Sequence, residues 1–312
     1  MSKRKAAVAL NEAYGLLNNE GKPIPRSPLS HPVIAKDRKF LAWNVGSLRS
    51  LVVKKPELLT RLYAEHRPAV LGLMETKISA DLEKSIEQDI RKIIDIKPQS
   101  DFRLIFNHSK TKKGYSGTLL IIDLSQTGPV SELSFECGAK AADEEGRLIS
   151  CFFQNMNQSV VLCYVPNSGQ NLERLKYRVD QFDEKLSTYC LYLKDSDPSR
   201  SVLLMGDLNV AVDDQDIWNL EAPHVEKQAG CTPEERSSFT THYLDRGFRD
   251  TFKTTHPEAT GWFTYWSVRA GNKPKNRGLR LDYVLSLGDF KEGLILEEYA
   301  PNGDHCVVGV VI

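Results

Sequence analysis

Short apolar runs, each ended by glycine, proline or a polar residue, recur along the chain from residue 40 onward and are separated by segments with helical spacing. Runs that are this short and this continuously apolar are typical of buried β-strands. The predicted strands lie at residues 40–45, 69–74, 103–106, 118–124, 147–154, 159–165, 202–205, 279–287 and 306–312.

The spacing of apolar residues predicts helices at residues 56–63, 79–96 and 172–193, of which the last is the longest. A further helix begins after Thr232, because Pro233 and two glutamates follow this capping residue. The strands outnumber what one doubly wound sheet needs, and many look antiparallel. We therefore predict an α/β four-layer sandwich, with two packed mixed β-sheets flanked by helices.

Residues 1–38 have a different pattern. They contain the basic cluster Lys3-Arg4-Lys5 and several prolines, with no sustained hydrophobic period. This composition predicts a flexible basic N-terminal arm ahead of a catalytic domain at residues 39–312. The cluster is compatible with a nuclear signal, an organelle presequence or a solvated tail. We expect an intracellular protein, with the nucleus favoured over an organelle.

Composition narrows the class of protein. The 312 residues are 41% hydrophobic and 26% charged, as in an ordinary globular domain with a sizeable core. No apolar run reaches membrane-spanning length, so we expect no membrane partner. The net charge is zero, so nucleic-acid binding would require a local basic patch. The six cysteines lack zinc-type spacing and indicate reduced, buried thiols. No heptad pattern is present, and a monomer is expected.

Polar side chains mark the ends of several predicted strands. Ligand sites in α/β sheets gather outside strand ends, so these side chains are expected to converge. Asp207 and Asn209 stand two apart in an extended segment and would face the same spot. A carboxylate can orient a water molecule and an amide can donate to an anionic oxygen, which suits attack on a phosphate. A local turn stabilised by the same two side chains is the alternative.

The convergent set is rich in carboxylate and amide oxygens and contains one histidine. These are hard ligands, typical of Mg²⁺ or Mn²⁺ sites. The set consists of Asn44, Glu75, Tyr164, Asn167, Asp207, Asn209, Asp282, Asp304 and His305.

An ordered series of motifs surrounds these residues. It runs through Trp43-Asn44-Val45, Leu73-Met74-Glu75-Thr76-Lys77, Gly114-Tyr115-Ser116-Gly117, Glu145-Gly146-Arg147, Tyr164-Val165-Pro166-Asn167, Gly206-Asp207-Leu208-Asn209, Arg280-Leu281-Asp282-Tyr283 and Gly303-Asp304-His305. The series covers residues 40–312 and resembles the endonuclease/exonuclease/phosphatase superfamily, specifically the apurinic/apyrimidinic endonucleases related to exonuclease III.

The resemblance implies a DNA repair enzyme that uses Mg²⁺, with Mn²⁺ able to replace it. Its substrate would be double-stranded DNA with abasic sites or blocked 3′ ends. The enzyme would hydrolyse the phosphodiester 5′ to the abasic site and leave a 3′-hydroxyl. Accompanying 3′-phosphodiesterase or 3′–5′ exonuclease activity is expected.

The resemblance also implies a role for each residue of the convergent set. Glu75 would be the main metal ligand, with Asp304 near the metal or at a second site. Asp207 would orient or deprotonate the attacking water, and Asn209 would donate to the scissile phosphate. His305, held by Asp282, would contact a non-bridging oxygen. The phosphate cradle would be completed by Tyr164, Asn44 and Asn167.

Contacts with DNA follow from the same resemblance. The family swings the abasic sugar of bent DNA into an apolar pocket, whose wall here would be Tyr265, Trp266, Leu279 and Leu281. A basic loop supplies the local positive patch, through Arg269, Lys273, Lys275, Arg277 and Arg280. Further DNA contacts are expected from Arg49, Lys77, Tyr115, Arg147 and Gln170.

Three positions depart from the family pattern. Gly46 stands where many relatives have an acid or an amide near the metal, so metal affinity is expected to differ. Met74 replaces a polar residue, and Gln170 replaces an arginine that inserts into the duplex in some relatives. The catalytic residues Asp207, Asp282 and His305 are retained, so we expect an active enzyme.

Two other functions fit parts of the pattern. One is a phosphatase of the same fold acting on a small phosphorylated substrate. The aromatic and basic segment 262–280 disfavours it, because such a surface suits a nucleic-acid backbone. The other is a DNA-binding module with an impaired metal site at Gly46. Retention of Asp207 and of the pair His305–Asp282 disfavours that function.

Overall fold

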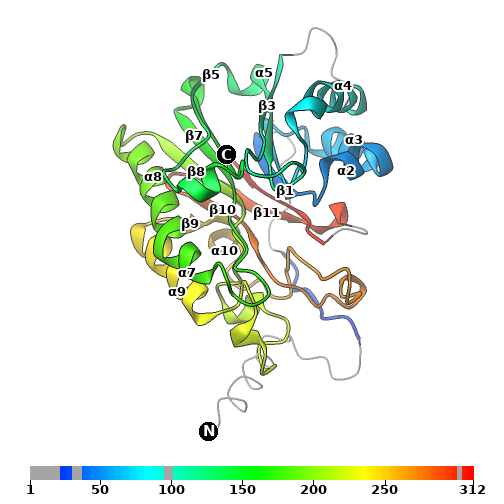
Figure 1. Cartoon of the computed structure of the whole chain (residues 1–312), viewed down its shortest axis with the longest axis vertical. Helices are drawn as coiled ribbons and strands as arrows, with labels where there is room; N and C mark the ends of the chain where they lie inside the picture. Colours follow the sequence, from blue (N-terminus) through cyan, green and yellow to red (C-terminus); the bar gives the residue numbers. More distant parts are fainter. Residues whose placement is uncertain (1–21, 30–36, 95–100, 301–303) are drawn as a thin grey trace.

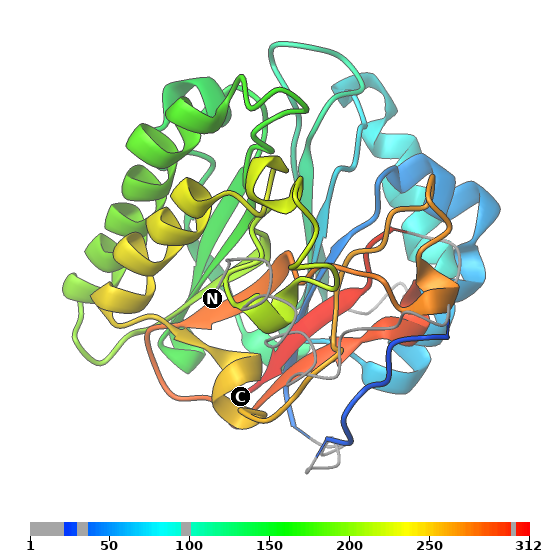
Figure 2. The same ribbon diagram turned by 90° about the horizontal axis from the view of Figure 1, so that it is seen from below.

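Two six-stranded β-sheets pack face to face, and helices cover the outer face of each (Figures 1 and 2). The computed structural model describes residues 22–29, 37–94, 101–300 and 304–312. In order across the first sheet, the strands are β11 (Glu292–Leu296), β12 (Val307–Val311), β1 (Lys39–Asn44), β2 (Val70–Met74), β4 (Thr118–Asp123) and β3 (Phe102–Asn107). Those of the second sheet are β5 (Val130–Ser134), β6 (Leu148–Phe153), β7 (Gln158–Tyr164), β8 (Ser201–Asp207), β10 (Asp282–Ser286) and β9 (Arg249–Asp250).

Each sheet is mixed and contains one parallel pair of long strands. β1 runs parallel to β2, and β7 runs parallel to β8, whereas the other pairs are antiparallel. In register, Asn44 lies opposite Met74, and Asp207 lies between Tyr164 and Asp282. Because parallel strands share their carboxyl ends, these polar residues lie at the same edge of the two sheets.

The core has three large layers and a smaller cluster around Ile217 and Leu279. One apolar cluster fills the space between the sheets, and two others lie under the helices on the outer faces. The first sheet is covered by α2 (Leu48–Lys54), α3 (Pro56–His66) and α4 (Glu83–Ile93). The second is covered by α8 (Asp183–Asp195) and α9 (Pro233–His242). The six cysteines are buried and free, and no helix in the described residues is long and apolar enough to cross a membrane.

The predicted four-layer sandwich is confirmed, and most predicted strands lie within a few residues of their observed bounds. The helix predicted at residues 79–96 is shorter, because a 3₁₀ turn, η1 (Ala80–Leu82), precedes α4. The helix predicted at 172–193 begins at α7 (Leu175–Tyr177) and passes through a π-helical turn, η3 (Arg178–Phe182), into α8. Strands β5, β9 and β11 and the short helix α10 (Thr251–Thr255) were not predicted from sequence.

Residues 22–29, part of the predicted flexible arm, are packed against the domain. Ile24 is buried, and its N–H donates to the carbonyl of Lys275 at 3.0 Å. Arg26 forms an ion pair with Glu297, and its guanidinium donates to Asn276. This stretch is therefore held in place, in contrast to the expectation for the arm. The basic cluster at residues 3–5 lies outside the described residues.

Close packing of the two sheets depends on Gly72 in β2. A Cβ at this position would lie 2.4 Å from Leu162 Cδ1 and 3.1 Å from Met205 Cε, both in the opposite sheet. We predict that Gly72→Val destabilises the protein by about 1–3 kcal/mol, because the side chain overpacks a filled core. Urea unfolding measures this change. Val53→Leu, which also enlarges a side chain but at an exposed helical position, should change stability by about 0.5 kcal/mol or less. Equal stability of the two variants would contradict this account of the core.

Candidate active site

Asp207, the last residue of β8, lies at the centre of the polar strand ends and is 1% exposed. Its Oδ2 accepts a hydrogen bond from Asn44 Nδ2 at 2.8 Å and lies 3.8 Å from His305 Nε2. Its Oδ1 accepts the backbone N–H of Asn209 at 2.9 Å. The carboxylate is therefore held in one orientation by partners from β1, from the loop after β8 and from the start of the last strand.

His305 lies between two carboxylates. Its Nδ1 is 2.8 Å from Asp282 Oδ2, and its Nε2 faces Asp207. The carbonyl of His305 accepts the indole N–H of Trp43 at 3.3 Å, which fixes the backbone at this point. The three side chains are buried, so their charges interact strongly.

Burial and the neighbouring charges shift the pKa values of this group. Burial raises the pKa of Asp207 to about 7, against the opposing effect of His305. Burial alone would lower the pKa of His305, but the carboxylates of Asp282 and Asp207 outweigh it and raise that pKa to about 10. At neutral pH the histidine is therefore an imidazolium, and Asp207 can take up or release a proton.

Glu75 follows β2 and adopts a left-handed backbone conformation, with φ 52°. Its Oε1 accepts hydrogen bonds from Asn44 Nδ2 at 3.0 Å and from Tyr164 OH at 2.8 Å. Its Oε2 lies 2.6 Å from Lys77 Nζ. Burial opposes ionisation, but the hydrogen bonds from Lys77, Asn44 and Tyr164 outweigh it and lower the pKa of Glu75. Asn44 thus joins Glu75 to Asp207.

The amides of Asn209 and Asn167 extend this network. Asn209 is also left-handed, with φ 50°, and its Nδ2 donates to the carbonyl of Val165 at 2.9 Å. Asn167 Nδ2 donates to Asn209 Oδ1 at 2.9 Å. The two amides therefore lie side by side, next to Asp207.

Two groups of side chains could hold a cation. Asp207, Asp282 and His305 offer ligand atoms that all lie within 4.8 Å of one another, but the protonated imidazole of His305 has no free lone pair for a metal at neutral pH. Asp304 borders a small cavity of about 50 Å³ together with Asn44 and His305, and a Cβ at Gly46 would lie 3.8 Å from its Oδ1. Glu75 thus contacts Asn44 directly, whereas Asp304 shares only the cavity with it. Their oxygens fit a hard divalent cation.

Comparisons with known proteins agree with this geometry. Residues 172–305 match the model of the Endonuclease/Exonuclease/phosphatase family. An exodeoxyribonuclease of Bacillus subtilis (strain 168) is 35% identical over 277 residues, which cover 88% of this chain and 99% of that protein. The chain belongs to the endonuclease/exonuclease/phosphatase family.

Other family members support this assignment. The DNA repair nuclease APEX1 of Danio rerio is 33% identical over 277 residues, which cover 88% of this chain and 82% of that protein. The crystal structure of an AP endonuclease from Leishmania major superimposes with a TM-score of 0.78 at 27% identity, covering 100% of this chain and 98% of that chain. The predicted resemblance and the expectation of a hydrolytic enzyme are confirmed.

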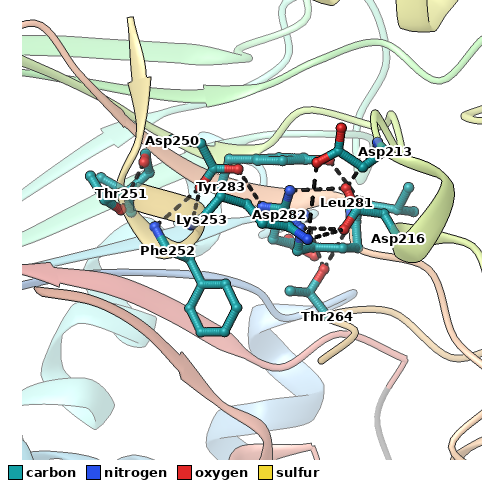
Figure 3. Close-up of polar contacts among 12 residues, drawn as sticks. Asp213, Asp216, Asp250, Thr251, Phe252, Lys253, Thr264, Leu281, Asp282 and Tyr283 are labelled. Atoms are coloured by element: carbon teal, nitrogen blue, oxygen red, sulfur yellow. Dashed lines mark hydrogen bonds and ion pairs between the residues drawn. The ribbon is translucent and has the colours of Figure 1, made fainter. Parts of the chain in front are cut away.

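In this family member, a buried charge network lies behind Asp282 (Figure 3). The Arg280 guanidinium contacts both oxygens of Asp216, at 2.8 and 2.9 Å, and Asp250 Oδ2 at 2.6 Å. Thr264 Oγ1 accepts the N–H groups of Leu281 and Asp282. The network fixes the start of β10. It also corrects the prediction that Arg280 belongs to the surface patch, because its side chain is buried.

Arg147, which was predicted to contact DNA, is instead buried inside the protein. It is 2% exposed, donates to the carbonyl of Tyr164 and to Tyr115 OH, and forms an ion pair with Glu145. Its guanidinium also stacks on the ring of Tyr164, 4.5 Å from the centroid. Arg147 therefore supports Tyr164 from within, and its other partner, Tyr115, is only half-buried.

The predicted pocket wall adjoins His305. The half-buried ring of Tyr265 lies 4.9 Å from the His305 ring, and Tyr265 pairs with both Leu279 and His305 through isolated β-bridges. Trp266 is fully buried, and its indole N–H donates to Asn276. Trp266 is therefore too buried to line the predicted pocket directly, and so are Leu279 and Leu281, at 4% and 6% exposed. Of the remaining predicted contacts, Arg49, Lys77, Gln170, Arg269 and Lys275 are exposed, whereas Lys273 and Arg277 are partly buried.

The raised pKa of Asp207 predicts how the hydrolytic rate depends on pH. Because proton acceptance requires the ionised carboxylate, kcat should rise with pH through about 7 and stay high up to pH 9, where His305 is still protonated. Single-turnover rates measured between pH 5 and 9 test this rise with pH. A rise near 3.8, the ordinary value for an aspartic acid, would contradict the account of the site.

Proposed function

We propose that this protein is a Mg²⁺-dependent nuclease that hydrolyses the phosphodiester 5′ to an abasic site in double-stranded DNA and leaves a 3′-hydroxyl. The observation that carries the proposal is the orientation of Asp207 by Asn44 and Asn209, opposite the pair His305–Asp282. Relatives named exodeoxyribonuclease and DNA-(apurinic or apyrimidinic site) endonuclease support it. We also propose 3′-phosphodiesterase or 3′–5′ exonuclease activity on blocked 3′ ends.

In this proposal, Asp207 orients the attacking water and accepts its proton. The raised pKa of the carboxyl makes that transfer favourable near neutral pH. The His305 imidazolium, held by Asp282, donates to a non-bridging phosphate oxygen as negative charge develops there. Asn209, Asn167 and Tyr164 complete the phosphate cradle.

Glu75 and Asp304 would hold Mg²⁺, with Mn²⁺ able to replace it. The bound cation would neutralise charge on the phosphate and on the leaving oxygen. Lys77 Nζ, at 2.6 Å from Glu75 Oε2, is the cation that now faces this carboxylate. Together with the missing side chain at Gly46, this contact supports the expectation of a metal affinity that differs from that of other family members.

Tyr265 would form the accessible part of the abasic-sugar pocket wall, with the buried Leu279 and Trp266 behind it. Arg49, Lys77, Tyr115 and Arg269 would contact the DNA backbone. Gln170, exposed after Asn167, would hold the cut product less firmly than an arginine. The proposed enzyme acts as a monomer, and its nuclear location stays a prediction.

We predict that Asp207→Asn lowers the rate of abasic-site cleavage by a factor of about 10²–10⁴, because the amide cannot accept the proton. The assay uses a labelled duplex with one abasic-site analogue and saturating Mg²⁺. Asp245→Asn, at an exposed position, is the matched control and should cut like the unaltered protein. Cleavage of a small phosphorylated substrate in place of the duplex would support the phosphatase alternative.

Removal of divalent cations with a chelator should abolish cleavage, and Mg²⁺ should restore it. We predict that Glu75→Gln raises the Mg²⁺ concentration needed for half-maximal cleavage by about tenfold or more, since it removes the main ligand charge. Calorimetric titration of Mg²⁺ provides a reading that is independent of activity. Glu226→Gln, an exposed control, should leave both readings unchanged. Binding of DNA without any cut at high Mg²⁺ and Mn²⁺ would support the DNA-binding alternative.

A further inference from the structure

A buried ion pair lies behind the two loops that present Asn167 and Asn209. Arg178, in the π-helical turn η3, and Glu235, in α9, are 1% and 0% exposed. Their charged groups meet at 2.9 Å, between Arg178 Nη1 and Glu235 Oε1. Neither side chain can reach DNA from this position, so the pair acts on the site only through the backbone and side chains that it holds.

Arg178 holds the backbone that follows Asp207. Its Nη2 donates to the carbonyl of Leu208 and its Nη1 to that of Asn209, each at 2.5 Å. Asn209 has a φ of 50°, in a region that non-glycine residues adopt at an energetic cost. With its carbonyl held by Arg178, the N–H of Asn209 donates to Asp207 Oδ1. The guanidinium thus stabilises a strained residue and, through it, the orientation of Asp207.

Glu235 joins two loops with one carboxylate and a third through the backbone of Gly230. Its Oε1 accepts the hydroxyl of Ser168, the neighbour of Asn167, at 2.5 Å. Its Oε2 accepts the N–H of Gly230 at 2.7 Å and the hydroxyl of Thr232 at 2.8 Å. The carbonyl of Gly230 in turn accepts the N–H of Ala211, beyond Asn209. The loops that contain Asn167 and Asn209 are therefore fixed to the same charged centre.

Stability alone is a weak reason for such a pair. Well-packed apolar side chains stabilise a core as well as a buried ion pair does, or better. The planar guanidinium, however, can serve two carbonyls and a carboxylate at once, which fixes their relative positions. A π-helical turn in a longer helix is also frequent at functional sites, and this turn begins at Arg178.

We propose that Arg178 and Glu235 are a positioning pair that sets the two asparagines relative to Asp207 for the chemical step. This inference rests on the proposed nuclease function and adds residues that do not touch the substrate. Loss of the pair should lower kcat and leave KM for DNA nearly unchanged, because the exposed side chains proposed to contact the DNA backbone are not altered.

The test compares Arg178→Lys and Glu235→Gln with Arg200→Lys. Arg200 is a matched control because it is buried, forms a bidentate pair with Glu132 and precedes β8, at the opposite end of the strand from Asp207. Cleavage of the abasic-site duplex is measured below the melting temperature of every variant. We expect kcat to fall by about 10–100-fold in the two test variants, with KM within about threefold, and both constants to be unchanged in Arg200→Lys.

Hydrogen exchange at the Asn209 amide gives a second reading that needs no substrate. Exchange should be faster in Arg178→Lys than in the unaltered protein or in Arg200→Lys, since the bond to Asp207 is no longer enforced. If the unaltered protein does not cut DNA, the proposed nuclease function is wrong. The hydrogen-exchange rate at Asn209 then decides whether Arg178 and Glu235 position this segment. Unchanged kcat and unchanged exchange in a folded Arg178→Lys would overturn the positioning role. If that variant does not fold, the same two readings on Glu235→Gln decide.

Discussion

The structure depends on a charge balance among Asp207, His305 and Asp282. Two carboxylates and one imidazole are buried within a few ångströms, where isolated charges are costly. The pair of acids favours a protonated histidine, and the histidine in turn limits how far burial raises the pKa of Asp207. One side of the site is thus a fixed positive charge, and the other is a group that can exchange a proton near neutral pH.

The two-sheet fold supplies the geometry that this balance needs. Asp207 and Asp282 are paired in register in neighbouring strands, and β1 from the facing sheet brings Asn44 to the same edge. Asn44 bridges Glu75 and Asp207, so one amide fixes the metal-ligand candidate relative to the proton acceptor. Close approach of the sheets, which requires Gly72, is therefore a condition for the site as well as for the core.

Much of this arrangement could be predicted from the sequence, because strands end where apolar runs end. Asn44, Glu75, Tyr164, Asp207 and His305 each follow or precede such a run, and these residues do converge. The buried charged side chains that pack around these residues could not be predicted in the same way. The local alternation of apolar and polar residues determines the face of the sheet to which each side chain points. Burial of a charged side chain, in contrast, depends on partners far away in the chain.

Arginines illustrate this limit. In sequence, Arg147, Arg178, Arg269 and Arg280 are equally polar, yet only Arg269 among them is exposed. Arg280 is buried because Asp216 and Asp250 meet it, and Arg178 because Glu235 does. The separations of 64, 30 and 57 residues leave no periodic signal. The capping motif at Thr232 did locate Glu235, but only as a helix residue and not as the partner of Arg178.

The most direct test of the central claim is the protonation state of His305, followed by nuclear magnetic resonance of its imidazole nitrogens as a function of pH. We expect an imidazolium at neutral pH that loses its proton near pH 10. In Asp282→Asn, the same resonance should titrate at lower pH. A neutral imidazole at pH 7 in the unaltered protein, titrating near the ordinary value of 6.5, would contradict the charge balance on which the proposed chemistry depends.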